Sequence, residues 1–127
     1  MLSDAEGFNS FAVDDLTQAQ QFYGEALGLK VETFEEGVPL LSLDLPGSGT
    51  TMIYEKADNQ PANHTVLNFK VDDLDTEVDE LTARGVSFER YDDFEQDDNG
   101  ISEGGGGPRI AWFKDPAGNT LGVMEEG

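Results

Sequence analysis

The chain has 127 residues and 37% hydrophobic content, which suits a single globular domain with a real core. Its 27 acidic and 7 basic residues give a formal net charge of −20, which argues against binding to nucleic acid or anionic lipid. It has no cysteine, which excludes disulfides, thiol nucleophiles and zinc–thiolate sites. Without a visible signal peptide or membrane-spanning apolar run, we expect a cytoplasmic protein.

The acidity admits two interpretations. Acidic pairs recur along the whole chain, for example at Asp14-Asp15, Asp72-Asp73 and Asp97-Asp98. An even spread is typical of a solvated surface whose self-repulsion is screened by the cations of a salt-rich medium. The alternative is attraction of a cationic ligand or partner, which would require the acids to cluster. We favour the solvated surface.

The first predicted helix follows the motif F-A-V-D-D-L at residues 11–16. Asp14 or Asp15 can cap it, apolar residues continue at helical spacing, and Gly28 ends it. The apolar alternation after Gly28 predicts a short strand and then the two strands of a hairpin, at residues 30–34, 39–43 and 51–54.

The second predicted helix follows a closely similar motif, F-K-V-D-D-L at residues 69–74. Asp72 or Asp73 can cap it, and Gly85 ends it. Its buried stripe is expected to be Leu74, Val78 and Leu81. Again a short strand and a hairpin are predicted, at residues 86–91, 108–113 and 120–124.

Two segments have loop composition. Residues 56–63 are polar, contain Pro61 and are expected to link the two halves. Residues 92–107 are acidic and end in the glycines 104–107, which predicts a mobile loop too polar to pack. A phosphate-binding loop is rejected there, because no Lys-Ser/Thr follows the glycines and the neighbours are acidic.

The doubled order predicts an α+β fold of two tandem βαβββ modules, at about residues 6–56 and 64–126, within a single domain over 1–127. Two such halves can curve a mixed sheet around a common cleft. This pattern resembles the vicinal-oxygen-chelate superfamily, which includes glyoxalases, bleomycin-resistance proteins and dioxygenases. The resemblance rests on the two V-D-D-L motifs, Phe22-Tyr23, Leu27-Gly28-Leu29 and the late W-F-K-D-P-A-G-N at residues 112–119.

The resemblance also implies where a metal would bind. Metal-using members of the superfamily carry four histidine, glutamate or glutamine ligands on four strands. The matching positions here are Phe8, Ile53, Val66 and Gly122. The pairing follows two offsets: 66 minus 8 is 58, as between the V-D-D-L motifs, and 122 minus 53 is 69, as between Gly49 and Gly118. None of the four offers an oxygen, nitrogen or sulfur donor, so we expect no metal and no other cofactor.

The cleft that the fold implies would be mostly apolar, with a few polar groups, as is usual for a small-molecule site. Trp112, the only tryptophan, can serve either as a stacking wall or as ordinary core. The small polar residues can bind a ligand or simply satisfy one another. The predicted lining residues are Phe8, Ser10, Ile53, Val66, Asn68, Trp112, Thr120, Gly122 and Met124.

Three functions remain in competition. The favoured one is a glyoxalase/bleomycin-resistance-like protein that binds a small molecule, cationic or aromatic, without a metal. This interpretation favours a binding protein over an enzyme. The second is a lyase, isomerase or dioxygenase with a non-standard or relocated metal site, for which His64, Tyr54 and Glu55 are weak catalytic candidates. The third is an interaction module without a small ligand. The resemblance further implies a homodimer.

Overall fold

The computed structural model describes residues 1–47, 49–92, 95–103 and 108–125. The chain divides into two compact units, Met1–Gln60 and Pro61–Gly127. The boundary falls inside the segment expected to be a linker. No helix among the described residues is long and apolar enough to cross a membrane.

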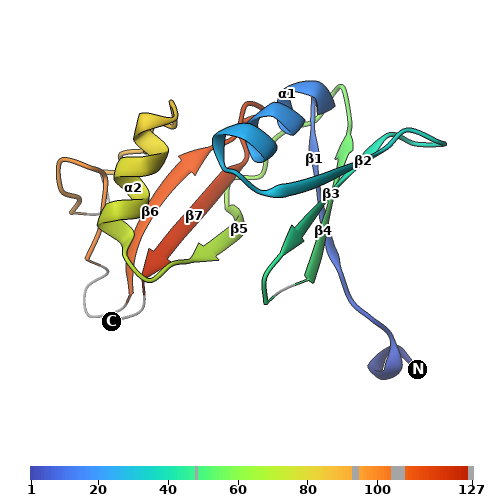
Figure 1. Ribbon diagram of the computed structural model, residues 1–127, viewed down its shortest axis with the longest axis horizontal. Coiled ribbons are helices and arrows are strands. Elements are labelled where there is room, and N and C mark those ends of the chain that lie inside the picture. Colours follow the sequence, from blue (N-terminus) through green and yellow to red (C-terminus); the bar gives the residue numbers. More distant parts are fainter. Residues whose placement is uncertain (48, 93–94, 104–107, 126–127) are drawn as a thin grey trace. The chain divides into compact units, whose positions relative to one another are not determined.

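Unit 1 contains a four-stranded sheet and one helical segment (Figure 1). A short 3-10 turn at Leu2–Asp4 precedes the sheet. The strands are ordered β1-β4-β3-β2, with β1 parallel to β4 and the other pairs antiparallel. Their bounds are β1 Asn9–Val13, β2 Lys30–Phe34, β3 Leu40–Leu45 and β4 Gly49–Glu55.

The helical segment of unit 1 begins as α1 Leu16–Gln21 and continues as a π-helical turn, Phe22–Ala26. The carboxylate of Asp15 accepts a hydrogen bond from the Gln18 backbone N–H at 3.1 Å, which fixes Asp15 as the N-cap. Gly28 ends the segment with a φ of 72°, a left-handed conformation that glycine adopts without strain. The predicted helix is confirmed, with the π turn as an addition.

Unit 2 repeats this plan with a three-stranded sheet among its described residues. Its sheet has the order β5-β7-β6, again with the first pair parallel and the second antiparallel. The strands are β5 Thr65–Lys70, β6 Arg109–Lys114 and β7 Thr120–Glu125. The helix α2 Leu74–Ala83 lies against β6 and β7 and begins at the N-cap Asp73, whose carboxylate accepts from the Thr76 N–H at 3.1 Å.

The strand predicted at residues 86–91 does not form. Only Phe88 makes an isolated bridge, to Phe113 of β6, and the Glu89 N–H donates to the Trp112 carbonyl at 2.7 Å. Phe88 instead packs its ring edge-on against Phe113, with centroids 5.6 Å apart. The segment therefore covers the edge of β6 through one bridge and a ring contact instead of a paired strand.

The expectation of a polar, unpacked loop at residues 92–107 is wrong for the described part, residues 95–103. Ile101 and Ser102 are buried there, and Ser102 forms bridges to Gln96 and to Ile110 of β6. The Gln96 amide accepts from the Tyr91 N–H and donates to the carbonyls of Glu89 and Gly100. These bonds satisfy backbone groups that the acidic composition alone would have left to water. Residues 93–94 and 104–107 lie outside the described residues.

Each unit buries one sheet face beneath its own helix. In unit 1 the buried strand residues face Ala19 and Tyr23 of the helical segment, and the rings of Phe11 and Tyr23 lie 6.0 Å apart. In unit 2 the predicted stripe of Leu74, Val78 and Leu81 is buried, as expected. The core strand residues are Phe11, Val13, Leu41, Leu43 and Ile53 in unit 1, and Leu67, Ala111, Phe113, Leu121 and Val123 in unit 2.

Candidate functional site

The sheet face of unit 2 that points away from α2 carries most of the predicted site residues. Residues that pair across neighbouring strands point to the same side of a sheet, and side chains alternate along each strand. Asn68 pairs with Gly122, which pairs with Trp112, while the buried Leu121 and Val123 point the other way. We call this surface the Trp112 face; its residues are Asn68, Lys70, Ile110, Trp112, Lys114, Thr120, Gly122 and Met124.

The centre of the Trp112 face is the row Asn68–Gly122–Trp112, which crosses all three strands. Gly122 lies on the central strand and contributes no side chain. A β-carbon built on it would lie 2.5 Å from Oδ1 of Asn68 and 3.6 Å from Cδ1 of Ile110. The Asn68 amide therefore occupies the space that a side chain at position 122 would need.

Trp112 is half-buried and has an aromatic neighbour. The ring of Tyr91 meets it edge-on, with centroids 5.5 Å apart and an interplanar angle of 78°. Such a T-shaped pair restrains both rings. The indole is thus a fixed apolar wall beside the Asn68 amide, which is exposed.

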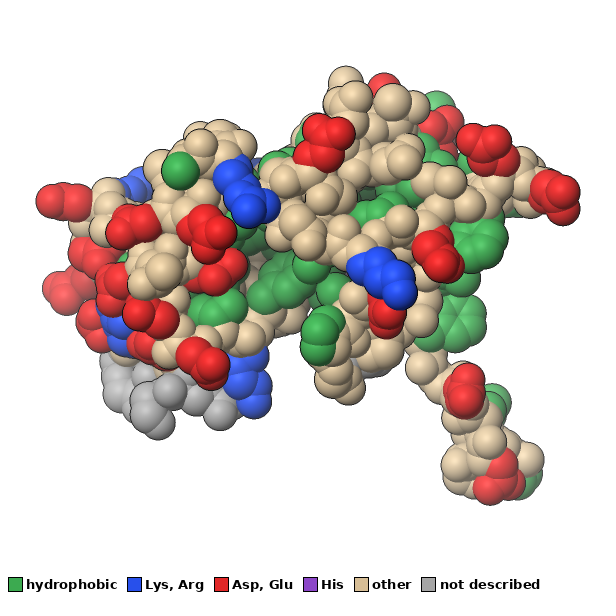
Figure 2. Space-filling view, viewed as in Figure 1, with side chains coloured by type: hydrophobic (Ala, Val, Ile, Leu, Met, Phe, Trp, Pro, Cys, Tyr) green, Lys and Arg blue, Asp and Glu red, His purple; other side chains and the backbone are tan. Residues whose placement is uncertain are grey.

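The charged residues of the Trp112 face are lysines. Lys70 shares a row with Met124 and Ile110, and Lys114 shares a row with Thr120. Lys114 also forms an ion pair with Glu89, at 3.5 Å. Figure 2 shows carboxylates gathered over the part of the molecule that contains α2, whose residues include Asp75, Glu77, Asp79 and Glu80. The described residues that the strand pairing places on this face include no carboxylate, and the neighbouring Glu89 is already paired with Lys114.

Val66 is not assigned to this face by the pairing. The register of β5 against β7 shifts between Thr65 and Leu67, so two residues of β5 oppose one step of β7. Val66 itself is half-buried.

In unit 1, the prediction that Ile53 shares a face with Ser10 is wrong. Ile53 pairs with Phe11 and Leu41, is fully buried and packs on the α1 side. Ser10 pairs instead with Met52, which is half-buried. Met52 is therefore the β4 residue on the outer face.

The doubled register identifies the source of this error. Phe11 pairs with Ile53 in unit 1, and Phe69 pairs with Val123 in unit 2. Since 69 minus 11 is 58 and 123 minus 53 is 70, the last strands are related by 70 residues and not by 69. Met52 thus corresponds to Gly122, and Gly49 corresponds to Asn119. The two turn glycines occupy different positions of their turns, and a slip of one residue reverses the face of every side chain.

The remaining unit 1 candidates lie apart from a common site. Phe8 immediately precedes β1, and its side chain is 69% exposed. Tyr54 pairs with Ala12 on the outer face, whereas Glu55 points to the opposite side and accepts a hydrogen bond from the Leu16 N–H at 3.0 Å. Glu55 therefore caps the start of α1, so Tyr54 and Glu55 do not converge as a catalytic pair. His64 is exposed just before β5.

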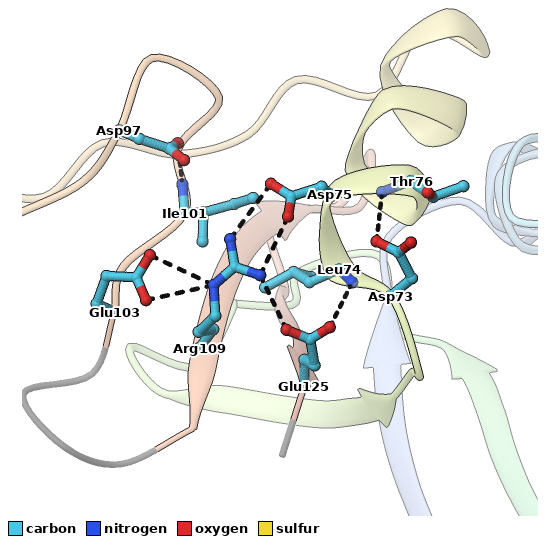
Figure 3. Close-up of polar contacts among 9 residues, drawn as sticks. All are labelled: Asp73, Leu74, Asp75, Thr76, Asp97, Ile101, Glu103, Arg109 and Glu125. Carbon is cyan, nitrogen blue, oxygen red and sulfur yellow. Dashed lines mark hydrogen bonds and ion pairs between the residues drawn. The ribbon is translucent and has the colours of Figure 1, made fainter. Parts of the chain in front are cut away.

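Sequence reasoning missed the equivalent of this cap in unit 2. Glu125 accepts from the Leu74 N–H at 3.4 Å and also from Arg109 at 2.8 Å (Figure 3). Arg109 further binds Asp75 and Glu103. Hydrogen bonds to Asp75 and Glu125 raise the pKa of Arg109 above its ordinary value. The cluster joins the start of α2, the end of β7 and the segment before β6, and could have been suspected from the spacing of Glu55 and Glu125, 70 residues apart.

A polar hollow lies in unit 1 between the helical segment and β2. Its volume is about 410 Å³, and its lining includes Gln20, Gln21, Glu25 and Val31. It lacks an aromatic wall, so the Trp112 face is the better candidate for an aromatic ligand.

The family model for the glyoxalase/bleomycin resistance protein/dioxygenase superfamily matches residues 8–123. The chain belongs to this superfamily. A search of the curated proteins found no match. The family assignment and the βαβββ plan expected from the sequence are thereby confirmed, except that residues 86–91 form an isolated bridge in place of a strand.

Solved structures of the same fold are similar over nearly the whole chain. TnmS3, described as an antibiotic-binding protein from Streptomyces sp. CB03234, has 22% identity and a TM-score of 0.72, with 98% of each chain covered. A superfamily member from Sphaerobacter thermophilus has 22% identity and a TM-score of 0.72, covering 96% of this chain and 98% of its own. The fosfomycin resistance protein FosX from Listeria monocytogenes has 14% identity and a TM-score of 0.71, covering 98% and 94%. These identities establish the fold alone.

Proposed function

We propose that this superfamily member binds a small molecule without a metal ion, and that the Trp112 face supplies binding groups. One observation carries the proposal: the row Asn68–Gly122–Trp112 combines an aromatic side chain with an exposed amide that lies over a central glycine. Small-molecule sites are typically apolar and aromatic, with few polar groups that fix orientation. The rest of the face, including Ile110 and Met124, fits that description.

The residues at the superfamily's metal positions do not fit a divalent cation. After the register correction these positions hold Phe8, Met52, Val66 and Gly122. Met52 adds only a thioether, a soft ligand that suits Cu(I) and not the hard or borderline divalent ions. No group of three or more His, Asp or Glu among the described residues is arranged to hold a metal. The proposal therefore assigns no step to a metal, and sequestration needs none.

Structures of this fold include one described as an antibiotic-binding protein and one described as a lactoylglutathione lyase, each 22% identical, so the choice between binding and catalysis rests on this chain's own residues. Catalysis would require groups that converge, and Tyr54 and Glu55 point to opposite faces of their sheet. The proposed role is capture of an apolar or aromatic compound on the Trp112 face.

Calorimetric titration with bleomycin and a panel of aromatic antibiotics tests this proposal, with and without EDTA. We expect at least one compound to bind equally well in both conditions. Trp112→Ala should weaken that binding, whereas Lys56→Ala, far along the sequence in unit 1, should leave it unchanged. Stoichiometric zinc, nickel, manganese or iron in the purified protein, or binding abolished by EDTA, would contradict metal independence.

The homodimer implied by the resemblance is part of the proposal. On the outer face of unit 1, the row Ala12–Tyr54–Leu40–Phe34 exposes aromatic rings, with Phe34 44% and Tyr54 36% accessible. Apolar surface of this kind is a frequent protein contact. Light scattering on a sizing column should give twice the chain mass of 13.8 kDa, and a monomer at micromolar concentration would refute the dimer.

A further inference from the structure

We infer that Asn68 determines ligand specificity on the Trp112 face, and that its amide selects neutral, flat aromatic compounds that offer a hydrogen-bond donor. The inference rests on the proposed function, because it assigns a ligand class to the same face. It adds a named residue, a named acceptor atom and a reason for the glycine at position 122.

The Asn68 amide fills the space over Gly122, where other residues would place a side chain. β7 is the central strand of the unit 2 sheet, so a side chain at position 122 would stand in the middle of the face. Gly122 has no side chain to fill that space, and Oδ1 of Asn68 lies there instead, 2.5 Å from where a β-carbon would be. Any other residue at position 122 would displace the amide. Gly122 and Asn68 therefore form a matched pair that brings a polar acceptor to the centre.

The Asn68 amide oxygen has apolar neighbours. Cδ1 of Ile110 lies 3.6 Å from the same point, and Trp112 stands on the far side of Gly122. Asn68 is exposed, so its amide is accessible to water when no ligand covers it. A ligand that covers the oxygen without donating a hydrogen bond leaves it unpaired, which costs binding free energy. A binding site therefore discriminates strongly against a ligand that lacks the hydrogen-bond donor and would leave such a polar group unpaired.

The distance between the Asn68 amide and Trp112 limits the shape of the ligand. Neighbouring strands lie about 4.8 Å apart, and Oδ1 of Asn68 lies over Gly122, so this oxygen is about one strand spacing from the strand that carries Trp112. A fused bicyclic ring can contact the indole and reach the oxygen over that distance. Tyr91 restrains the indole edge-on, which keeps the wall in place.

The charged residues of the Trp112 face limit the charge of the ligand. The strand pairing places Lys70 and Lys114 on the Trp112 face, and the Glu89 carboxylate beside Lys114 is already paired with it at 3.5 Å, so a cationic ligand would meet lysines there. The net charge of −20 disfavours an anion. A neutral ligand avoids repulsion by the lysines and by the net negative charge. Of the two ligand classes expected from the sequence, cationic and aromatic, we therefore retain the aromatic one.

The test uses 2-naphthol and 2-methoxynaphthalene, which share one neutral bicyclic ring and differ in the O–H donor. Binding is measured by calorimetry and by the single indole N–H resonance of Trp112. We expect the native chain to bind 2-naphthol about tenfold more tightly, the value of one hydrogen bond to an otherwise unpaired acceptor. Asn68→Ala and Asn68→Leu should bind both probes equally. Gly122→Ala should also lose the preference, because its methyl group displaces the amide.

Asn63→Ala is the matched control, since it removes an exposed amide just before β5 and should keep the tenfold preference. Unfolding midpoints establish that each variant folds. If Gly122→Ala does not fold, the two Asn68 variants decide the outcome. A preference that survives in Asn68→Ala overturns the inference. If Trp112→Ala then abolishes binding of both probes, the Trp112 face remains the proposed binding site, and only the role of Asn68 is wrong. If neither naphthalene binds but an antibiotic of the panel does, the ligand class is wrong and the proposed function survives.

Discussion

Ile53 pairs with Phe11 across β1 and β4, and both side chains are buried on the face that packs against the helical segment of unit 1. Unit 2 repeats the pairing with Val123, which is buried, and Phe69, which is half-buried. This register places Met52, and not Ile53, on the outer face. The two neighbouring residues should therefore respond very differently to substitution.

Ile53→Ala should lower the free energy of unfolding by about 2–4 kcal/mol, because it leaves a cavity in a core that exposes none of this side chain. Met52→Ala should lower it by less than about 1.5 kcal/mol, since Met52 is only half-buried. Urea unfolding followed by circular dichroism measures both. Equal losses, or a larger loss for Met52→Ala, would mean that the register of β4 is wrong by one residue.

Arg109 connects three carboxylates, and its side chain is only 25% exposed. Arg109→Ala removes these bonds and leaves Asp75, Glu103 and Glu125 to repel one another (Figure 3). We expect a loss of about 1–3 kcal/mol in unfolding free energy. Arg84→Ala is the matched control: it breaks an exposed i,i+4 pair with Glu80, and such a pair is worth less than about 0.5 kcal/mol. Similar losses in the two variants would show that the cluster contributes nothing beyond a surface pair.

Asp73 should make the stability depend on pH. Its pKa lies below the ordinary value of 3.8, because the Thr76 backbone N–H and then the Thr76 hydroxyl donate hydrogen bonds to the carboxylate. A depressed pKa in the folded state stabilises the fold above pH 3.8, and the contribution disappears as the pH falls through the folded-state pKa.

The measurement is the difference in urea midpoint between the native chain and Asp73→Ala, taken from neutral pH downward. The difference should be largest at neutral pH and should shrink below pH 3.8. Asp73→Ser retains a neutral cap and should show a stability difference intermediate between the two. A difference that stays constant over the whole range would exclude the charged cap as its origin.

The net charge of −20 predicts that salt stabilises the fold by screening self-repulsion. The urea midpoint should rise between 0.1 and about 2 M KCl, and it should rise less in the double variant Asp72→Asn/Asp79→Asn, whose acids are exposed. An equal response in the variant would attribute the effect to salting-out of apolar surface. No response at all would leave the solvated-surface interpretation of the acidity without support.

The sequence was sufficient for the parts of the fold that local chemistry determines. The caps at Asp15 and Asp73, the ends at Gly28 and Gly85 and the two hairpins follow from helix capping, glycine conformation and apolar alternation. The internal doubling follows from the two V-D-D-L motifs alone. These signals are local, so tertiary packing did not override them.

The errors arose where long-range pairing decides. Gly49 and Gly118 both have positive φ, at 87° and 94°, but only the strand pairing reveals that they occupy different turn positions. The acidic segment before β6 packs because the Gln96 and Asp97 side chains satisfy its backbone, which composition cannot show. The close approach of Asn68 to Gly122 likewise required coordinates.

The proposed binding of a small molecule to the Trp112 face without a metal can be tested residue by residue. The most direct measurement is a two-dimensional NMR titration with 2-naphthol in EDTA, following the indole N–H of Trp112 and the backbone amides of the whole chain. We predict saturable shifts at Asn68, Trp112, Gly122 and Met124, with the α2 amides unmoved. Shifts confined to the polar hollow beside α1, or no shift of Trp112 with either naphthalene or any antibiotic of the panel, would contradict the claim.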